Sequence, residues 1–417
     1  MHRLARPGVP GPRRPRPPGL TLPVALLVAG LVAVLAAPAS AARRRVPAGF
    51  LGVDAGGVLV DPSLGDRRLN SELGEMVRTG VESVRITIYW SLTQPYSNAF
   101  AVPPGQGFRY QYLDGVPTDW SLTDRIYRAV AARHLQVLPT ILAAPIWARL
   151  DPRRAWSPPA DPATFGRFVG RVVQRYGTGG AFWRAHPELP AQPTRQWQIW
   201  NEPLGGVPGA PTVYWDDPGH RAEPRYVALL RSARAAIKSV DPRGKVVLAG
   251  LFGKSWVLLA DLYRFGIHGL FDEAAMNLFT KHASDQVGGV SYVHSVLSQH
   301  RDRHVPILVT EFSWPTARGH FPGYAVSAQQ AARNVGRAMR LLARSRRRYN
   351  LLQIYYYTWL TPDSGHKLFD YAGLRRLKNG RVVPKPAQAA YRNEARALEG
   401  CVKTQVATAC RRGARRR

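Results

Sequence analysis

Cysteines and metal-binding motifs are nearly absent from this sequence. Only two of its 417 residues are cysteines, Cys401 and Cys410, and neither belongs to a CxxC pair. This argues against a cysteine-ligated zinc site and against a disulfide-rich scaffold. His300 and His304 stand four residues apart, but the residues between them lack the glutamate of a zinc protease. We therefore expect no metal and no cofactor.

Both cysteines follow the last predicted helix, in a basic C-terminal tail that we assign to residues 401–417. In an exported protein, two cysteines this close can form a small disulfide loop that fixes the end of the chain. Two free thiols are the alternative. The sequence therefore predicts a disulfide between Cys401 and Cys410, provided that the chain is exported.

Acidic residues are scarce as well. The chain has 27 Asp and Glu against 58 Lys and Arg, which gives a formal charge of +31. Thirteen arginines lie in residues 1–45 and 411–417, and without them the body still carries about +18. The arginines are spread over many predicted helices, with no groove-reading motif beside them. We therefore expect no nucleic-acid partner, although the charge favours anionic surfaces or acidic polysaccharides.

No acidic residue occurs before Asp54, and residues 1–41 have the features of an export signal peptide. An arginine-rich start leads into an apolar run from Leu20 to Ala37, and the sequence ASA at residues 39–41 has the small-x-small form of a cleavage site. A retained membrane anchor is the alternative, because about 18 apolar residues can just span a bilayer. We expect a secreted, extracellular protein, or a membrane-anchored one that faces outside.

Beyond this segment, short apolar runs alternate with amphipathic stretches, which is typical of β/α units around a parallel sheet. Eight nearly continuous apolar runs predict strands at Phe50–Val53, Ser83–Ile88, Gln136–Ile141, Gln196–Trp200, Lys245–Leu251, Ala274–Leu278, Pro306–Thr310 and Leu351–Tyr357. Periodic stretches between them predict helices at Leu69–Thr79, Leu122–Arg133, Pro162–Tyr176, Pro224–Val240, Trp256–Phe265, Ser291–Arg301, Ala328–Arg346 and Pro386–Leu398. The sequence thus predicts an α/β fold, a single (β/α)₈ TIM barrel over residues 42–400.

Two motifs place a glutamate directly after a predicted strand. The fourth strand ends in the sequence WQIWNEP, which contains Asn201 and Glu202, and the seventh ends in ILVTEFSWP, which contains Glu311. The active site of a parallel barrel lies at these strand ends. Either glutamate alone could be an exposed loop carboxylate or a helix cap. The fourth and seventh strands face each other, however, so the pair predicts two catalytic carboxylates at the separation of about 5 Å that suits glycosidic bond cleavage.

The WNEP and TEFSW motifs resemble those of clan A glycoside hydrolases, in particular the family 39 and family 5 types, and the resemblance extends over the whole predicted barrel. It implies a retaining enzyme with Glu202 as acid/base and Glu311 as nucleophile. The SVRI sequence of the second strand matches the clan's arginine that keeps the nucleophile ionised, which would be Arg85 here. The YYTW sequence of the eighth strand matches the clan's tryptophan beneath the bound sugar, which would be Trp359.

The sixth strand departs from this pattern. The clan usually carries His-x-Tyr there, and the tyrosine hydroxyl contacts the nucleophile. The corresponding residues here are Asn277 and Phe279, and His282 follows closely enough to take over part of that role. This departure concerns the tuning of Glu311 and leaves both catalytic carboxylates in place.

Further aromatic residues are candidates for contacts with sugar rings. They are Trp90, Trp147, Trp215 and Trp314, and plain packing is an equally good explanation for each. The longest connection, residues 91–120, also carries six aromatic residues. These either stack on sugars or form the core of their own loop.

Together these features predict a retaining glycoside hydrolase that acts on O-glycosidic, in particular β-linked, bonds of a polysaccharide, oligosaccharide or glycoside by double displacement. In that mechanism Asn201 binds the sugar 2-hydroxyl. Xylosides, glucosides, mannosides and arabinosides all suit such a site. The alternatives are an inactive carbohydrate-binding barrel, a transglycosidase that uses the same site, and a charge-driven polymer binder in which Glu202 and Glu311 have no role.

Overall fold

A computed structural model describes most of the chain. The described residues are 44–59, 61, 65–204, 215, 222–317, 321 and 325–410. The predicted export signal and the arginines from Arg411 onward lie outside them. Within the described ranges, no helix combines the length and the apolar character needed to cross a membrane.

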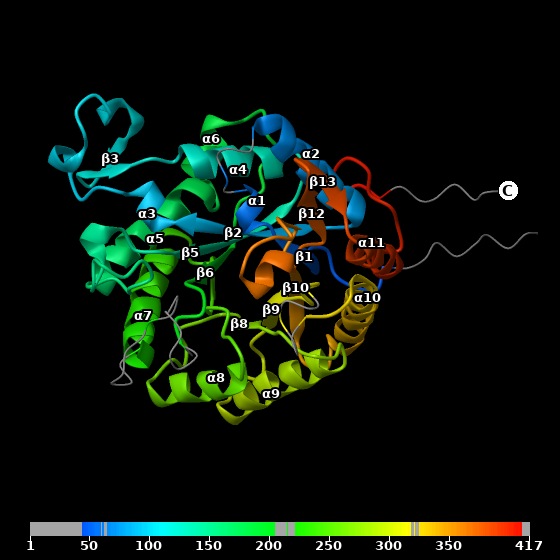
Figure 1. Cartoon of the computed structure of the whole chain (residues 1–417). Coiled ribbons are helices and arrows are strands. Elements are labelled where there is room, and N and C mark those ends of the chain that lie inside the picture. Colours follow the sequence, from blue (N-terminus) through cyan, green and yellow to red (C-terminus); the bar gives the residue numbers. More distant parts are fainter. Residues whose placement is uncertain are drawn as a thin grey trace, which may run out of the picture. The chain divides into compact units, whose positions relative to one another are not determined.

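The centre of the protein is a barrel of eight parallel strands (Figure 1). They are β1 (Leu51–Asp54), β2 (Ser83–Tyr89), β5 (Gln136–Leu142), β6 (Gln196–Ile199), β7 (Lys245–Val247), β8 (Ala274–Asn277), β9 (Ile307–Phe312) and β10 (Leu351–Tyr357). Their order is β7-β6-β5-β2-β1-β10-β9-β8, and parallel bridges from Val247 to Glu273 and from Leu251 to Met276 join the two outer strands. Each matches a predicted strand, so the predicted (β/α)₈ TIM barrel is confirmed.

Side chains fill the interior of the barrel. Five strands contribute one residue each to a buried cluster that is separate from the outer core: Leu138, Val247, Ala275, Leu308 and Tyr355. Gly52 of β1 makes room for the Tyr355 ring, because a Cβ at Gly52 would lie 2.4 Å from a ring carbon of Tyr355. The Tyr355 hydroxyl hydrogen bonds to Ser83 Oγ at 2.7 Å. The barrel is therefore a packed core, and ligands can reach only its ends.

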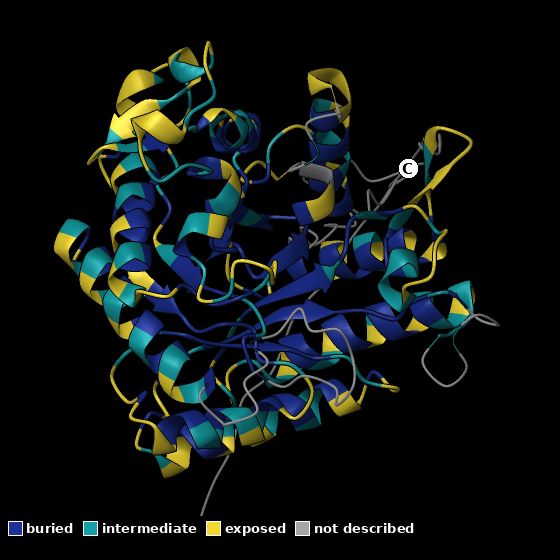
Figure 2. Cartoon of the chain, turned by 60° about the vertical axis from the view of Figure 1, so that its left-hand side comes forward, coloured by how far each residue is buried: buried dark blue, intermediate teal, exposed yellow. Residues whose placement is uncertain are grey.

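Helices surround the barrel and bury one face each against it (Figure 2). The eight that correspond to predictions are α2 (Asp66–Thr79), α4 (Ser121–Ala131), α5 (Pro162–Tyr176), α7 (Ala222–Val240), α8 (Ser255–Arg264), α9 (Asp285–Gln299), α10 (Ala328–Ser345) and α11 (Pro386–Glu399). Among them, α5 and α10 begin with a side-chain cap. Asp161 accepts hydrogen bonds from the backbone N–H groups of Ala163 and Thr164, and Pro162 occupies the first turn of α5.

The prediction for α9 began too late, at Ser291 instead of Asp285. Gly288 and Gly289 in the first turns weakened the helical pattern of the sequence, because glycine is a poor helix former. The structure shows why a glycine suits the second position. A Cβ at Gly289 would lie 2.6 Å from the side chain of Leu278, so close packing on the barrel requires its absence.

Several short elements were not predicted. After β2 the chain forms α3 (Trp90–Thr93), two 3₁₀ turns, η1 (Ala99–Ala101) and η2 (Gly107–Arg109), and a hairpin of β3 (Gln111–Leu113) and β4 (Val116–Thr118), which projects from the barrel in Figure 1. Smaller additions are α1 (Gly56–Leu59), η3 (Ile146–Ala148), α6 (Ala181–Ala185) and η4 (Leu368–Tyr371). A second small sheet contains β11 (Leu360–Thr361), β12 (Arg375–Lys378) and β13 (Arg381–Pro384). These strands are only two to four residues long and mostly exposed or half-buried, so they carry little hydrophobic pattern.

The end of the described chain packs onto the barrel. Cys401 and Cys410 form a disulfide, with their Cα atoms 5.4 Å apart. Within this loop Lys403 is buried and lies 2.6 Å from Glu82 and 2.7 Å from Glu399. The loop is therefore fixed both covalently and by a buried ion-pair cluster.

Candidate active site

Polar side chains from four barrel strands and the loop after a fifth meet at the C-terminal end of the barrel. They are Asp54 of β1, Arg85 of β2, Asn201 and Glu202 after β6, Asn277 of β8 and Glu311 of β9. Asp54, Arg85, Asn277 and Glu311 are buried, whereas Asn201 and Glu202 are partly exposed. The opening of the site therefore lies on the side of Asn201 and Glu202.

Arg85 is the centre of this cluster. Its Nη1 atom donates to Glu311 Oε1 at 2.7 Å and to Asp54 Oδ2 at 2.5 Å, while its Nη2 donates to Asn201 Oδ1 at 2.8 Å. Its Nε donates to Gln198 Oε1 at 2.7 Å. These contacts use the planar geometry of the guanidinium, which a lysine could not reproduce. Arg85 therefore holds two carboxylates and the Asn201 amide in one fixed arrangement.

Glu202 reaches the same cluster from the other side of the barrel through a sharp bend of the backbone. Trp200 and Glu202 both have positive φ angles, 69° and 45°. The Glu202 N–H donates to Gly250 O at 3.1 Å, and Asn277 Nδ2 donates to Glu202 Oε1 at 2.6 Å. Residues other than glycine seldom adopt such φ angles, so the surrounding contacts must impose this bend.

Asn277 connects the two halves of the site. Its Nδ2 atom also lies 3.2 Å from Asn201 Oδ1, and its own Oδ1 accepts from Thr310 Oγ1 at 2.8 Å. A Cβ at Gly250 would lie 2.4 Å from Asn277 Oδ1, so the neighbouring strand end makes room for this amide. Glu202 and Glu311 are thus linked through Asn277, Asn201 and Arg85.

The electrostatic balance of the site is unusual. Burial raises the pKa of Glu311 well above that of an ordinary glutamate; the positive charge of Arg85 opposes this effect, and the negative charges of Glu202 and Asp54 reinforce it. Two carboxylates, those of Asp54 and Glu311, contact the single guanidinium of Arg85, and the charge of Glu202 acts on Glu311 from nearby. Like charges this close disfavour the ionised form of Glu311, and the charge of Arg85 is what opposes them.

The prediction that Trp359 lies beneath the bound sugar is wrong. Trp359 is fully buried, its Nε1 donates to Glu72 Oε2 of α2 at 2.9 Å, and the Arg375 guanidinium lies over its ring. The strand ends at Tyr357, and the Trp359 N–H then bonds to Asp54 O at 3.0 Å, so the chain turns away and carries the tryptophan outward. Trp359 therefore belongs to the layer between barrel and helices.

Tyr357 takes the position at the site that was predicted for Trp359. It is partly exposed, and its ring contacts Phe279 and Phe369 edge-on, with centroids 6.2 Å and 5.6 Å away. Burial raises the pKa of the Tyr357 phenol, and the nearby negative charges of Glu311, Asp54 and Glu202 raise it further. The phenol therefore stays protonated and can donate a hydrogen bond close to the carboxylates.

The other tryptophans divide into core and surface. Trp90 is fully buried and stacks on Phe168, and Trp314 is 2% exposed. Neither ring is therefore accessible for the sugar contact for which it was a candidate. Trp215 is also buried, against Trp200. Trp147 is partly exposed, and its Nε1 donates to a backbone carbonyl, so of these four it alone remains a candidate for sugar contact.

The structure shows where Asn277 and Phe279, which replace the usual sixth-strand His and Tyr, lie relative to the site. Asn277 is a member of the site, whereas Phe279 contributes only an apolar ring beside Tyr357. His282 is exposed near the start of α9, where its backbone N–H bonds to Asp285, and among the described residues its imidazole makes no hydrogen bond to Glu311. The phenol of Tyr357 on the eighth strand lies near enough to Glu311 for the two groups to interact through charge.

Sequence reasoning missed Asp54 and Tyr357. Asp54 had a usable signal, because it ends the apolar run LGVD in the same way that Glu202 and Glu311 follow their strands. Tyr357 stands in a run of three tyrosines followed closely by a tryptophan, and the sequence did not reveal where the strand ends. Among the described residues no cluster of His, Cys, Asp and Glu side chains is arranged to hold a metal ion.

The solved structures that resemble this chain include several glycoside hydrolases. A family 39 glycoside hydrolase from the gut symbiont Bacteroides cellulosilyticus WH2 matches over 85% of this chain and 64% of its own, with a TM-score of 0.56 and 14% identity. A monomeric β-xylosidase from Caulobacter crescentus CB15 matches over 84% and 69%, with a TM-score of 0.56 and 17% identity. The Ignisphaera aggregans GH53 catalytic domain matches over 83% and 96%, with a TM-score of 0.52 and 21% identity.

The chain spans less than two thirds of the Bacteroides protein. A comparison with protein-family models finds no match, and neither does a comparison with curated protein sequences. All three structural likenesses are below 25% identity and concern the fold. The chain thus shares its (β/α)₈ barrel with clan A glycoside hydrolases, among them enzymes of family 39, and at the level of the fold this confirms the resemblance that the two glutamate motifs suggested.

Proposed function

We propose that this protein is a retaining glycoside hydrolase that cleaves β-linked O-glycosidic bonds. The observation that carries the proposal is the hydrogen-bonded cluster in which Asn277, Asn201 and Arg85 connect Glu202 to Glu311. The two glutamates come from opposite sides of the barrel and influence each other's charge. A pair of carboxyl groups in this relation is what double displacement requires.

The surroundings of the two glutamates give them different roles. Arg85 lies 2.7 Å from Glu311 and stabilises its carboxylate, so Glu311 is the nucleophile. Glu202 lies on the open side of the site, where it accepts a hydrogen bond from Asn277 Nδ2. We therefore assign the acid role to Glu202, which donates its carboxyl proton to the leaving oxygen.

The charge coupling between the two glutamates also drives the second half of the reaction. When Glu311 forms the covalent glycosyl-enzyme, its negative charge disappears. Loss of that charge favours ionisation of Glu202, which then accepts a proton from the incoming water. The same two side chains therefore alternate between charged and neutral forms through the cycle.

Two neighbouring groups would position the sugar. Asn201 Oδ1 already accepts from Arg85 and Asn277, which leaves Asn201 Nδ2 to donate to the 2-hydroxyl. Tyr357 offers an aromatic face and a protonated hydroxyl beside the carboxylates. Trp147 is a further contact at the rim. The β-xylosidase among the structural neighbours supports β-xylosides as the first substrates to examine.

The test is a panel of aryl β-glycosides, followed by mass spectrometry of the protein inactivated with the matching 2-fluoro-sugar. The label is expected on Glu311, and Glu311→Ala should lower turnover by several orders of magnitude. The exposed Glu188→Ala variant is the control and should keep full activity. Hydrolysis by Glu311→Ala at a near-native rate would refute the assignment.

A second candidate function is an inactive carbohydrate-binding barrel. It is favoured by the absence of the sixth-strand histidine and tyrosine. It predicts oligosaccharide binding without turnover or label. A transglycosidase would share the site and the label, and product analysis at high acceptor concentration distinguishes it. The disulfide between Cys401 and Cys410 supports export for all three, because such bonds persist in oxidising compartments.

A further inference from the structure

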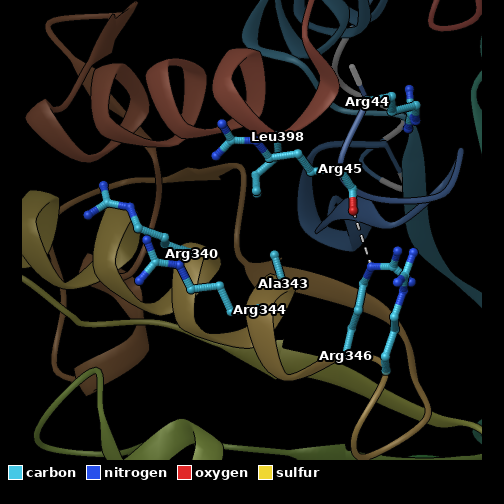
Figure 3. A pocket seen from close by; sticks show the side chains of 8 residues that line it. Arg44, Arg45, Arg340, Ala343, Arg344, Arg346 and Leu398 are labelled. Atoms are coloured by element: carbon cyan, nitrogen blue, oxygen red, sulfur yellow. Dashed lines mark hydrogen bonds between the residues drawn. The ribbon is translucent and has the colours of Figure 1, made fainter. Parts of the chain in front are cut away.

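A basic hollow lies at the end of the barrel opposite the candidate active site. It has a volume of about 600 Å³ and is lined by Arg44, Arg45, Arg340, Ala343, Arg344, Arg346, Arg347 and Leu398. Figure 3 shows Arg340 and Arg344 extending from α10 on the same side, with Ala343 and Leu398 between the arginines. Six of the eight lining residues are thus arginines over a small apolar floor.

Most of this positive charge is not neutralised. Arg44 pairs with Glu82 and Arg340 with Glu394. No carboxylate of the described chain pairs with Arg45, Arg344 or Arg347, all of which are exposed. Residues 312–362, which include α10, contain eight arginines and no acidic residue. The hollow is therefore a site for negative charge.

The positive surface continues along α10. A second hollow of about 530 Å³ between α10 and α11 shares Arg340 and Arg344 with the first and adds Arg333 and Arg337. These four arginines recur at helical spacing, so they lie on one face of α10. The extended basic surface suits a ligand that presents many negative charges, more than it suits a single anion.

The hollow lies at the end of the barrel where the strands begin. Arg45 shortly precedes β1 and Arg347 shortly precedes β10, so both lie at the N-terminal ends of the strands. The carboxylates of the candidate active site lie at the opposite, C-terminal ends. In the sequence, the apolar run Leu20–Ala37 stands a few residues before Arg44. An apolar segment followed by clustered arginines is typical of attachment to an anionic lipid surface.

We propose that this basic face binds the anionic phospholipid headgroups of a membrane and thereby turns the candidate active site away from the bilayer. Each arginine near such a surface strengthens binding by a factor of about five. The lining contains no aromatic ring on which nucleic-acid bases could stack, which favours lipid over single-stranded nucleic acid. In the membrane-anchored alternative, the face acts together with the retained apolar run, since stable membrane attachment generally takes two signals.

The test compares the full chain with two triple variants that lose the same charge. R45Q/R344Q/R347Q removes exposed arginines of the hollow whose side chains make no hydrogen bond within the described structure. R153Q/R154Q/R167Q removes exposed arginines from the loop after β5 and from α5. Sedimentation with phosphatidylcholine vesicles, with and without phosphatidylglycerol, measures binding at low and high salt. Circular dichroism verifies folding.

The expected result is binding that requires phosphatidylglycerol, falls with salt, and drops by roughly 100-fold in the first variant but little in the second. Equal losses in both variants would refute a specific face, since only net charge would then matter. Binding that ignores both phosphatidylglycerol and salt would assign attachment to the apolar run alone. Displacement by millimolar inorganic phosphate, or tighter binding to DNA through the same arginines, would also overturn the proposal.

Discussion

Glu273 gives the protein a pH-dependent weakness that can be measured. This glutamate directly precedes β8 and is 5% exposed, and its Oε2 accepts from Gln196 Nε2 at 2.6 Å. Burial raises its pKa from 4.5 to about 7, and the charge of Asp272 adds to this, while Gln196 and Lys245 oppose it. The folded protein therefore prefers the protonated carboxyl. We consider the variant Glu273→Gln, which keeps the acceptor for Gln196 and removes the titration.

The sign of the effect follows from the raised pKa. The stabilising contribution of Glu273 is complete below pH 4.5 and is lost as the pH rises through about 7, because the folded state must then bury a charge. Each unit of pKa difference corresponds to about 1.4 kcal/mol. Relative to the native protein, Glu273→Gln should thus gain about 3 kcal/mol of unfolding free energy between pH 4.5 and pH 8.

Urea unfolding at several pH values measures this difference directly. Glu399, whose pKa burial also raises to about 7, titrates in both proteins and therefore cancels in the comparison. The exposed Glu188→Gln variant is the control and should show no comparable gain at high pH. If the unfolding free energy of Glu273→Gln differed from that of the native protein by the same amount at pH 4.5 and at pH 8, the cost assigned to burying the charge of Glu273 would be wrong.

Three further predictions concern the candidate active site. Arg85→Lys keeps the charge but not the fork of donors, so kcat should fall about 100-fold in a folded protein, whereas near-native kcat would contradict the role of Arg85. Asp54→Asn removes a negative charge that, together with burial, raises the pKa of Glu311, so the acid limb of the pH profile of kcat/KM should move to lower pH. An acid limb that stays in place or moves to higher pH would exclude this coupling between Asp54 and Glu311. Tyr357→Ala should lower kcat/KM at least tenfold, whereas Trp359→Phe should lower the melting temperature and leave kcat/KM unchanged. A large loss of kcat/KM in Trp359→Phe but not in Tyr357→Ala would identify Trp359 as the sugar platform.

The barrel itself could be predicted from the sequence because its signals are local. Eight apolar runs and the helical stretches between them determine β/α alternation, and a chain of such units has few ways to bury its strands on both faces. The positions of Glu202 and Glu311 directly after two predicted strands then indicated the active site, since active sites of parallel barrels lie at the ends of strands. The short strands β12 and β13 were not predicted, because two exposed strands of four residues each show almost no hydrophobic periodicity.

The sequence by itself therefore determined the barrel, the two facing glutamates and the arginine of the second strand. Only the tertiary structure decided which neighbouring side chains join them. Whether Tyr357 or Trp359 faces the site depends on where β10 ends and on the contact of Trp359 with Glu72, some 290 residues earlier in the chain. Asp54 and Asn277 likewise acquire their roles from partners on other strands. Periodicity records which residues are buried, but the direction of a side chain after a strand ends is set by packing between distant segments.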